Sequence, residues 1–336
     1  MKDKNQKKKN NIKESILILL LIAILLIAST YAWFTANTNV EISTLNVKVE
    51  AANGLQISAD GTNWKTILQN TDIDPDNVTT TYASNVNQIP TIMEPTSTVG
   101  TMTEAGQMEM FAGTVTSDED GNWVLSSKKL TDTKGKGDNA GKYIVFDTFL
   151  KVDEDMELSL EAGSGVTVKE GGTDKGLQNA ARVAFVELGH TDSGSDLATI
   201  QGLNNGTNSV VHIWEPNYNR HTSTGITNAK DNYGKTVTDN SDTADSYVGV
   251  KAEIGTPVAL ASTDEQYFAS VTPDYTTIDT GEKVSLLSLK AGITKIRIYM
   301  WVEGQDVDCE NNASNGNITF DLQITTELPE GASTSE

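Results

Sequence analysis

The feature that most limits the fold of this chain is a series of short segments in which apolar and polar residues alternate. A period of two is typical of β-strands that turn one face toward a core. No comparable helical run appears, so we predict an all-β protein. Asx-Gly pairs separate the segments and supply the positive φ angles that tight turns require. These pairs are Asn53-Gly54, Asp60-Gly61, Asp120-Gly121, Asn205-Gly206 and Asn315-Gly316.

Strands this short and numerous favour an antiparallel β-sandwich over residues 51–327, because two facing sheets bury the alternating residues. Two long insertions, near residues 70–116 and 215–264, interrupt the pattern as long loops or small subdomains. The tail, residues 328–336, is predicted to be disordered. The predicted strands are residues 40–50, 55–58, 143–152, 156–160, 182–188, 210–214, 284–289, 295–302 and 318–325.

The first 32 residues have the composition of an export signal. Six lysines precede an apolar run of 13 residues, from Ile16 to Ala28. This run is shorter than the roughly 20 residues of a spanning helix and fits a signal-peptide core. The basic flank holds the N-terminus in the cytoplasm, so the remaining chain is expected outside the cell.

The residues after the apolar run suggest a cleavage site. Small residues at Thr30 and Ala32 predict cleavage by a signal peptidase between Ala32 and Trp33. The alternative is an uncleaved membrane anchor over residues 16–34, with aromatic residues at the interface. The protein is then expected to be extracellular, or held at the cell surface if the segment is not cut.

Charge and cysteine content exclude several classes of protein. Residues 1–32 hold 6 of the 25 basic and 2 of the 46 acidic residues, so the remaining 304 residues carry a net charge of −25. This charge disfavours nucleic-acid binding, because no basic patch remains to neutralise phosphates. Cys309 is the only cysteine, so no intrachain disulfide can form, and a buried structural thiol is expected.

Catalytic residues are scarce. The three histidines, His190, His212 and His221, do not form a zinc-binding HExxH motif, and no histidine lies near Cys309 in sequence. His212 is predicted on an exposed strand position and His221 in a polar loop. We therefore expect no enzyme and no cofactor. A metal-dependent hydrolase would require His212, His221 and a carboxylate to converge in the fold.

One acidic stretch offers weak metal candidates. Glu303, Asp306, Asp308 and Glu310 follow a predicted strand, and their carboxylates are ligands that calcium accepts. Their spacing does not match an EF-hand loop. The simpler interpretation is a solvated acidic turn.

The junction STYAWFTANTNVEISTLNVKVEA resembles the start of proteins of the TasA/camelysin family, which Gram-positive bacteria export through a SipW-type signal peptidase. The match comprises Ala32 before the aromatic pair Trp33-Phe34, and then a first strand. The stretch WVEGQDVDC also resembles the end of exported proteins that share this N-terminus. The resemblance is specific over about residues 10–50 and diffuse beyond.

The resemblance implies a secreted jelly-roll-like β-sandwich that self-associates at the cell surface or in a biofilm matrix. In fibre-forming members the freed N-terminal segment, here residues 33–50, completes a sheet of the neighbouring subunit. Such strand addition satisfies unpaired backbone groups at a sheet edge. Camelysin-type members are linked to proteolysis, but no catalytic residue carries over. The residues assigned to the donor strand are Val40, Ile42, Leu45, Val47 and Val49.

A second hypothesis is a membrane-anchored surface module that binds a glycan or a protein. Here the uncut segment would hold the protein on the cell, and Trp214 or Tyr218 would contact the ligand. Aromatic side chains suit sugars, although burial of Trp214 in the core is the simpler expectation.

Overall fold

The computed structural model describes Trp33 and residues 40–49, 54–240, 246–260, 262–277 and 283–328. This part of the chain is mostly β, with sheets of eight, seven, four and two strands that are joined largely by antiparallel pairs. The prediction of an all-β class is confirmed in this sense. The predicted signal segment, residues 1–32, lies outside the described residues. No described helix is long and apolar enough to cross a membrane.

The eight-stranded sheet is buried on both faces. Its central strand β20 pairs antiparallel with β10 and β13, and every residue of β20 is buried. Ile298 on β20 belongs to the main core, whereas its neighbour Tyr299 belongs to a second hydrophobic cluster on the opposite face. The strands of this sheet are β2 (Gln56–Ser58), β4 (Gln88–Ile89), β9 (Gly135–Lys136), β10 (Ile144–Val152), β13 (Ala181–Thr191), β14 (Val210–Pro216), β18 (Tyr275–Thr277) and β20 (Gly292–Val302).

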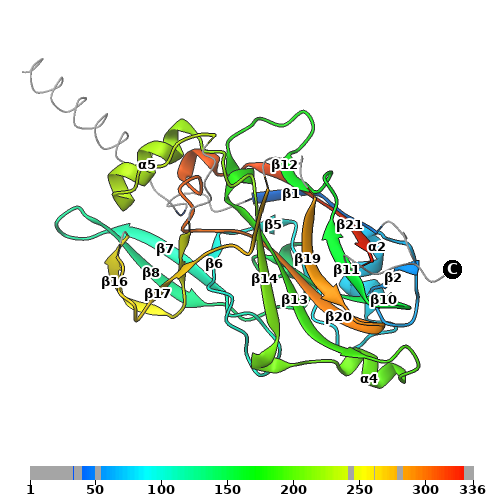
Figure 1. The fold of residues 1–336 in the computed structure, drawn as a ribbon. Coiled ribbons are helices and arrows are strands. Elements are labelled where there is room, and N and C mark those ends of the chain that lie inside the picture. Colours follow the sequence, from blue (N-terminus) through cyan, green and yellow to red (C-terminus); the bar gives the residue numbers. More distant parts are fainter. Residues whose placement is uncertain are drawn as a thin grey trace, which may run out of the picture.

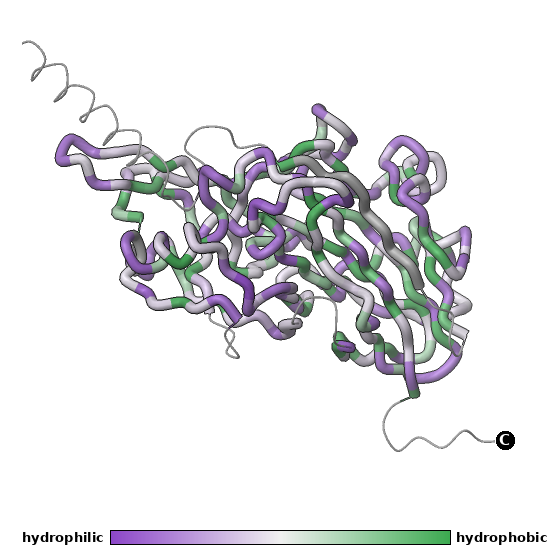
Figure 2. The backbone as a smooth tube through the Cα atoms, turned by 90° about the horizontal axis from the view of Figure 1, so that it is seen from above, coloured by the Kyte–Doolittle hydropathy of each residue, from purple (hydrophilic) through white to green (hydrophobic). Residues whose placement is uncertain are grey.

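The seven-stranded sheet shares the main core with the eight-stranded sheet. Leu158 and Phe320 from this sheet join Phe146 and Ile298 from the other in one hydrophobic cluster. Figure 2 shows hydrophobic segments along these strands and hydrophilic residues at many of the turns. The strands are β1 (Val40–Val49), β3 (Ile67–Leu68), β5 (Ile92–Met93), β11 (Met156–Leu160), β12 (Gly165–Val168), β19 (Val284–Leu289) and β21 (Asn317–Glu327).

The two predicted insertions contribute to a small β subdomain beside the larger sheets (Figure 1). Strand β16 from the second insertion pairs antiparallel with β8, which in turn pairs with β7. A third hydrophobic cluster fills this subdomain, so the insertions are packed structure rather than loops. The strands are β6 (Thr96–Ser97), β7 (Phe111–Ser117), β8 (Trp123–Lys129), β15 (Tyr247–Val250), β16 (Ile254–Ala259) and β17 (Phe268–Val271).

The sequence shows no helical run comparable to the strands, yet the described residues include short helices. Helix α5 begins after its N-cap Thr222, whose side chain accepts a hydrogen bond from Gly225, and ends at Gly234 with φ of 62°. Its Thr, Asn and Gly residues have low helix propensity and form no apolar stripe, so periodicity did not reveal it. The α-helices are α2 (Asn70–Ile73), α3 (Pro75–Val78), α4 (Leu197–Gly202) and α5 (Ser223–Tyr233).

The nine strands predicted from the sequence are all present, and half of their ends shift by one to three residues. The predicted turn pairs also occur, for example with φ of 85° at Gly54 and 84° at Gly121. The tail differs at its first residue, because Leu328 packs against the main core. Residues 329–336 lie outside the described residues.

Candidate functional site: the first strand, the Trp33 slot and the acidic loop

Strand β1, which contains the predicted donor residues, lies within a sheet of its own chain. It runs parallel to β21, from Glu41 opposite Asn317 to Val49 opposite Ile324. On its other side it forms only two short ladders, with β3 and with β5. The pairing to β21 is therefore the main backbone interaction that holds β1.

A register shift between Ile42 and Thr44 explains why the predicted donor residues change from even-numbered to odd-numbered positions along β1. The apolar positions are even-numbered up to residue 42 and odd-numbered from residue 45, and the shift absorbs this change. Val40 is fully buried. The register places Ile42, Leu45, Val47 and Val49 opposite Ile318, Phe320, Leu322 and Ile324, all of which are buried on β21.

Trp33, the residue after the predicted cleavage site, occupies a slot between the small subdomain and the loop after β20. Its side chain is 1% exposed and belongs to the third hydrophobic cluster. The indole Nε1 donates a hydrogen bond of 3.2 Å to Gln305 Oε1. A Cβ at Gly304 would lie 2.5 Å from the indole ring, and one at Gly113 would lie 2.8 Å from it. We call the site formed by these residues the Trp33 slot. Only glycine, which has no Cβ, can lie this close to the indole ring.

The acidic loop, residues 303–310, follows β20 and contains the four candidate metal ligands. The prediction of a solvated turn is wrong, because Glu303, Asp306, Asp308 and Glu310 are each no more than 7% exposed. Other segments cover the loop. The Glu303 amide donates to the Ala180 carbonyl, and the Gly304 amide donates to Thr96.

Neutral donors satisfy two of these carboxylates. Glu303 accepts hydrogen bonds from Trp301 Nε1 at 3.0 Å and from the Gln305 amide at 3.0 Å. Glu310 accepts one from the Asn312 amide at 2.6 Å. Burial raises the pKa of Glu303 to about 7 and that of Glu310 to about 7, because the charged form is poorly solvated.

Asp306 belongs to a buried ionic triad. Arg182 Nη2 bonds to Asp306 Oδ2 at 2.7 Å and also pairs with Glu215, and the guanidinium lies 5.4 Å from the ring centroid of Tyr247. Burial raises the pKa of Glu215 to about 7, and the Asp306 charge adds to the shift. One cation therefore serves two buried carboxylates. A cavity of about 200 Å³ opens beside the triad, and Tyr218 is among its lining residues.

Asp308 joins the acidic loop to the start of α5. Its Oδ1 accepts from the Thr222 amide and hydroxyl, both at 2.8 Å, and its Oδ2 lies 2.9 Å from His221 Nδ1. Burial alone would lower the pKa of His221, but the bond to Asp308 and the charge of Asp306 raise it. Burial raises the pKa of Asp308, although the bond to His221 opposes this shift.

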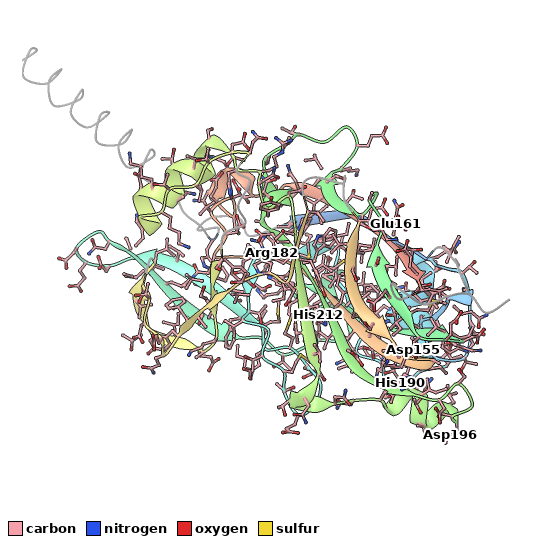
Figure 3. The ribbon with its side chains drawn as sticks, in the orientation of Figure 1. Asp155, Glu161, Arg182, His190, Asp196 and His212 are labelled. Atoms are coloured by element: carbon pink, nitrogen blue, oxygen red, sulfur yellow. The ribbon has the colours of Figure 1, made fainter. Side chains whose placement is uncertain are left out.

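The histidines do not converge. Figure 3 shows His190 and His212 at different points along the eight-stranded sheet, with His212 between Arg182 and His190. His190 bonds to the Ala291 carbonyl, and half-buried His212 lies near the hydroxyl of Tyr275. Within the described ranges, no three His, Cys, Asp or Glu side chains are grouped so as to hold a metal ion. Cys309 is fully buried, and burial raises the pKa of its thiol.

The two aromatic residues of the binding-module hypothesis are placed differently. Trp214 is fully buried in the main core, and its Nε1 donates to Thr277 Oγ1 at 3.2 Å. It is therefore a core residue, as the simpler expectation held. Tyr218 lines the cavity beside the Arg182 triad.

Sequence reasoning missed Arg182, Glu215 and the glycines of the Trp33 slot. Arg182 begins the segment RVAFVEL, and Glu215 follows VVHIW, so each charge directly adjoins an apolar strand. A charged residue next to a strand that is buried on both faces is a signal for a buried ion pair. The glycines gave no such signal, because Gly113 and Gly304 lie far from Trp33 in sequence.

Comparisons with protein-family models, with curated proteins and with solved structures give no significant match to this chain. The resemblance to the TasA/camelysin family therefore stays a prediction.

Proposed function

We propose that this protein is an exported structural component of the cell surface or extracellular matrix, with a jelly-roll-like sandwich that assembles by exchange of its first strand. In the assembled form, β1 of one subunit takes the place of β1 in the next subunit. Each subunit then completes the sheet edge of its neighbour by β-strand addition.

The pairing of β1 is the observation that carries this proposal. Its long parallel ladder joins it to β21, whereas the ladders with β3 and β5 each involve two residues of β1. A first strand held mainly along one edge can be withdrawn without unthreading the remaining fold. The edge of β21 that it leaves offers unpaired N–H and C=O groups, which the same segment of another copy satisfies in the same register.

Export supports the same function. The basic and apolar start of the sequence predicts that the folded part lies outside the cell, and cleavage after Ala32 would free residues 33–50 from the membrane. Mass spectrometry of the protein from its source is the direct measurement. A start at Trp33 is expected, and an intact start would favour the anchored binding module.

Cysteine cross-linking tests the exchange at a defined point of the ladder. Asn46 on β1 lies opposite Asp321 on β21. We expect a mixture of the single variants Asn46→Cys and Asp321→Cys, in the chain of residues 33–336, to give disulfide-linked heterodimers on oxidation. A chain that carries both substitutions, oxidised before assembly, is locked as a monomer and is expected to form filaments only after reduction.

Two controls make the result decisive. Glu157 on β11 lies opposite Ser288 on β19, and neither strand exchanges in the proposal. A mixture of Glu157→Cys and Ser288→Cys is therefore expected to give no heterodimer. The unaltered chain carries only the buried thiol of Cys309. Any disulfide-linked dimer that it forms on oxidation therefore arises from this natural cysteine. Filaments formed by the locked, oxidised chain would refute strand exchange.

A further inference from the structure

The main chain at Trp33 has an unusual conformation. Its φ is 63°, in the left-handed region, which is disfavoured for a bulky L-residue because Cβ crowds the backbone. The angle φ is defined by the carbonyl carbon of the preceding residue. A chain that begins at Trp33 has no such carbon, so the same placement of the indole ring then carries no backbone strain.

The main-chain nitrogen of Trp33 faces an electronegative environment. Its N–H donates a hydrogen bond to the thiol of Cys309, and the carboxylates of Asp306, Glu303 and Glu310 lie close enough to act on that thiol. Every one of these groups is at least nine-tenths buried. The start of the chain therefore lies next to several carboxylates in a medium that screens charge weakly.

Cations are fewer than carboxylates around this point. Arg182 acts on Glu303, but it is already paired with Glu215 and Asp306. Among the described residues, no salt bridge joins a Lys or Arg side chain to Glu303 or Glu310. Their raised pKa values reflect this deficit, since an uncompensated buried carboxylate retains its proton. A further cation at this position would favour their ionised forms.

We propose that the Trp33 slot is the receptor for a processed chain start, in which the α-ammonium group of Trp33 lies against Cys309 and supplies the missing cation for the acidic loop. This inference rests on the cleavage after Ala32 that the proposed function includes. Hydrolysis of that bond adds water, leaves a carboxylate on Ala32 and frees the Trp33 amine, which takes up a proton at neutral pH. Cleavage then stabilises the binding of Trp33, which precedes β1, in its slot.

Two versions of the chain that differ by one residue test this proposal. One begins at Trp33 and the other at Ala32, each released from a fusion by a protease that leaves no extra residue. At pH 7 we expect the Trp33 start to unfold at a Tm higher by about 3–6 °C, because only its amine reaches the acidic loop. Its α-amine is expected to react with a methylating reagent at least tenfold more slowly in the native protein than in denaturant.

The acidic partners are tested by substitution. In the double variant Glu303→Gln and Glu310→Gln, the Tm difference between the two starts is expected to become smaller, and what remains reflects Asp306 and the relief of backbone strain at Trp33. The matched control is Asp155→Asn, an exposed carboxylate at another end of the molecule that pairs with Lys290 (Figure 3). This control should retain the full difference. Equal Tm values for the two starts, or an α-amine that reacts as fast in the native as in the denatured protein, would overturn the proposal.

These measurements are made on monomers, so they do not depend on filament formation. A failure of the cross-linking experiment would leave the amine reactivity of a Trp33 start unchanged. Conversely, a natural start elsewhere than Trp33 would refute the cleavage in the proposed function, whereas the prepared Trp33 start would still report whether the slot accepts an ammonium group.

Discussion

The fit of Trp33 between two glycines gives a prediction that a double-mutant cycle can test. In the chain of residues 33–336, Trp33→Ala removes a side chain that is 1% exposed. Loss of a buried Trp side chain costs about 3–5 kcal/mol, since its apolar contacts are lost and a cavity remains. Gly304→Ala removes nothing, but its new Cβ would lie 2.5 Å from the indole ring. That contact is too short to persist, so the ring must leave the slot.

We therefore expect Gly304→Ala to lower the free energy of unfolding nearly as much as Trp33→Ala does when the ring is present. In the Trp33→Ala background the empty slot accepts a methyl group, and the expected loss is less than about 0.5 kcal/mol. The coupling energy is then about 2–4 kcal/mol, well above the error of additivity for separate sites. Guanidinium unfolding followed by far-ultraviolet circular dichroism measures it, because this signal does not depend on the indole.

The matched control is Gly194→Ala, where a Cβ meets no atom within 4 Å and φ is not positive. Its cost is expected to stay within about 0.5 kcal/mol in both backgrounds. If Gly304→Ala costs the same with and without Trp33, the penalty arises from another neighbour, and the slot does not hold the ring as described.

Two further predictions concern buried charges. Asp147 is fully buried and bonds to Arg297 Nε at 2.7 Å, so Asp147→Asn leaves a buried guanidinium uncompensated and is expected to cost about 3–5 kcal/mol in denaturant unfolding. Burial raises the pKa of Glu303 to about 7 in the folded state, from 4.5 for the free side chain. Because the folded state keeps its proton longer, stability in a chain that retains Ala32 falls by about 3 kcal/mol as pH rises from 4.5 to 7. Glu303→Gln should remove the part of this fall that comes from Glu303, while Glu215 and Glu310, whose pKa values are also raised to about 7, still contribute. An unchanged pH profile would contradict the assignment.

Local sequence patterns predicted the strands well because each strand has an apolar face that it must bury. The segment YIVFDTFLKV became β10, and KIRIYMWV lies wholly within β20. The pattern did not show that the eight-stranded sheet is covered on both sides. Lys295 and Arg297 alternate with apolar residues of β20, and both are buried against Asp147 on β10. That pairing depends on sheet register, which single-strand periodicity does not encode.

The acidic loop is a second case in which the sequence pattern did not reveal burial. Its carboxylates were visible in the sequence, but their burial depends on Ala180, Thr96 and Thr222, which come from three distant segments. A dense run of carboxylates is normally solvated, because burial of each charge is costly without a partner. Sequence alone therefore indicated where the charges lie and could not indicate that they are enclosed.

The two insertions contribute to the Trp33 slot, which lies at the start of the chain segment that leads to β1. The first insertion contains Gly113 on β7, which lines the slot, and the second contributes Val250 and Ile254 to the cluster around the indole. The first insertion also supplies β5, which pairs with the start of β1. Together the insertions hold Trp33, which precedes β1, and so they fix the start of the chain before the exchanging strand begins. If strand exchange occurs, Trp33 must leave this slot or enter the slot of a neighbour, because only six residues separate it from Val40. Occupancy of the slot should therefore set the rate of exchange, and Trp33→Ala is expected to exchange subunits faster than the unaltered chain.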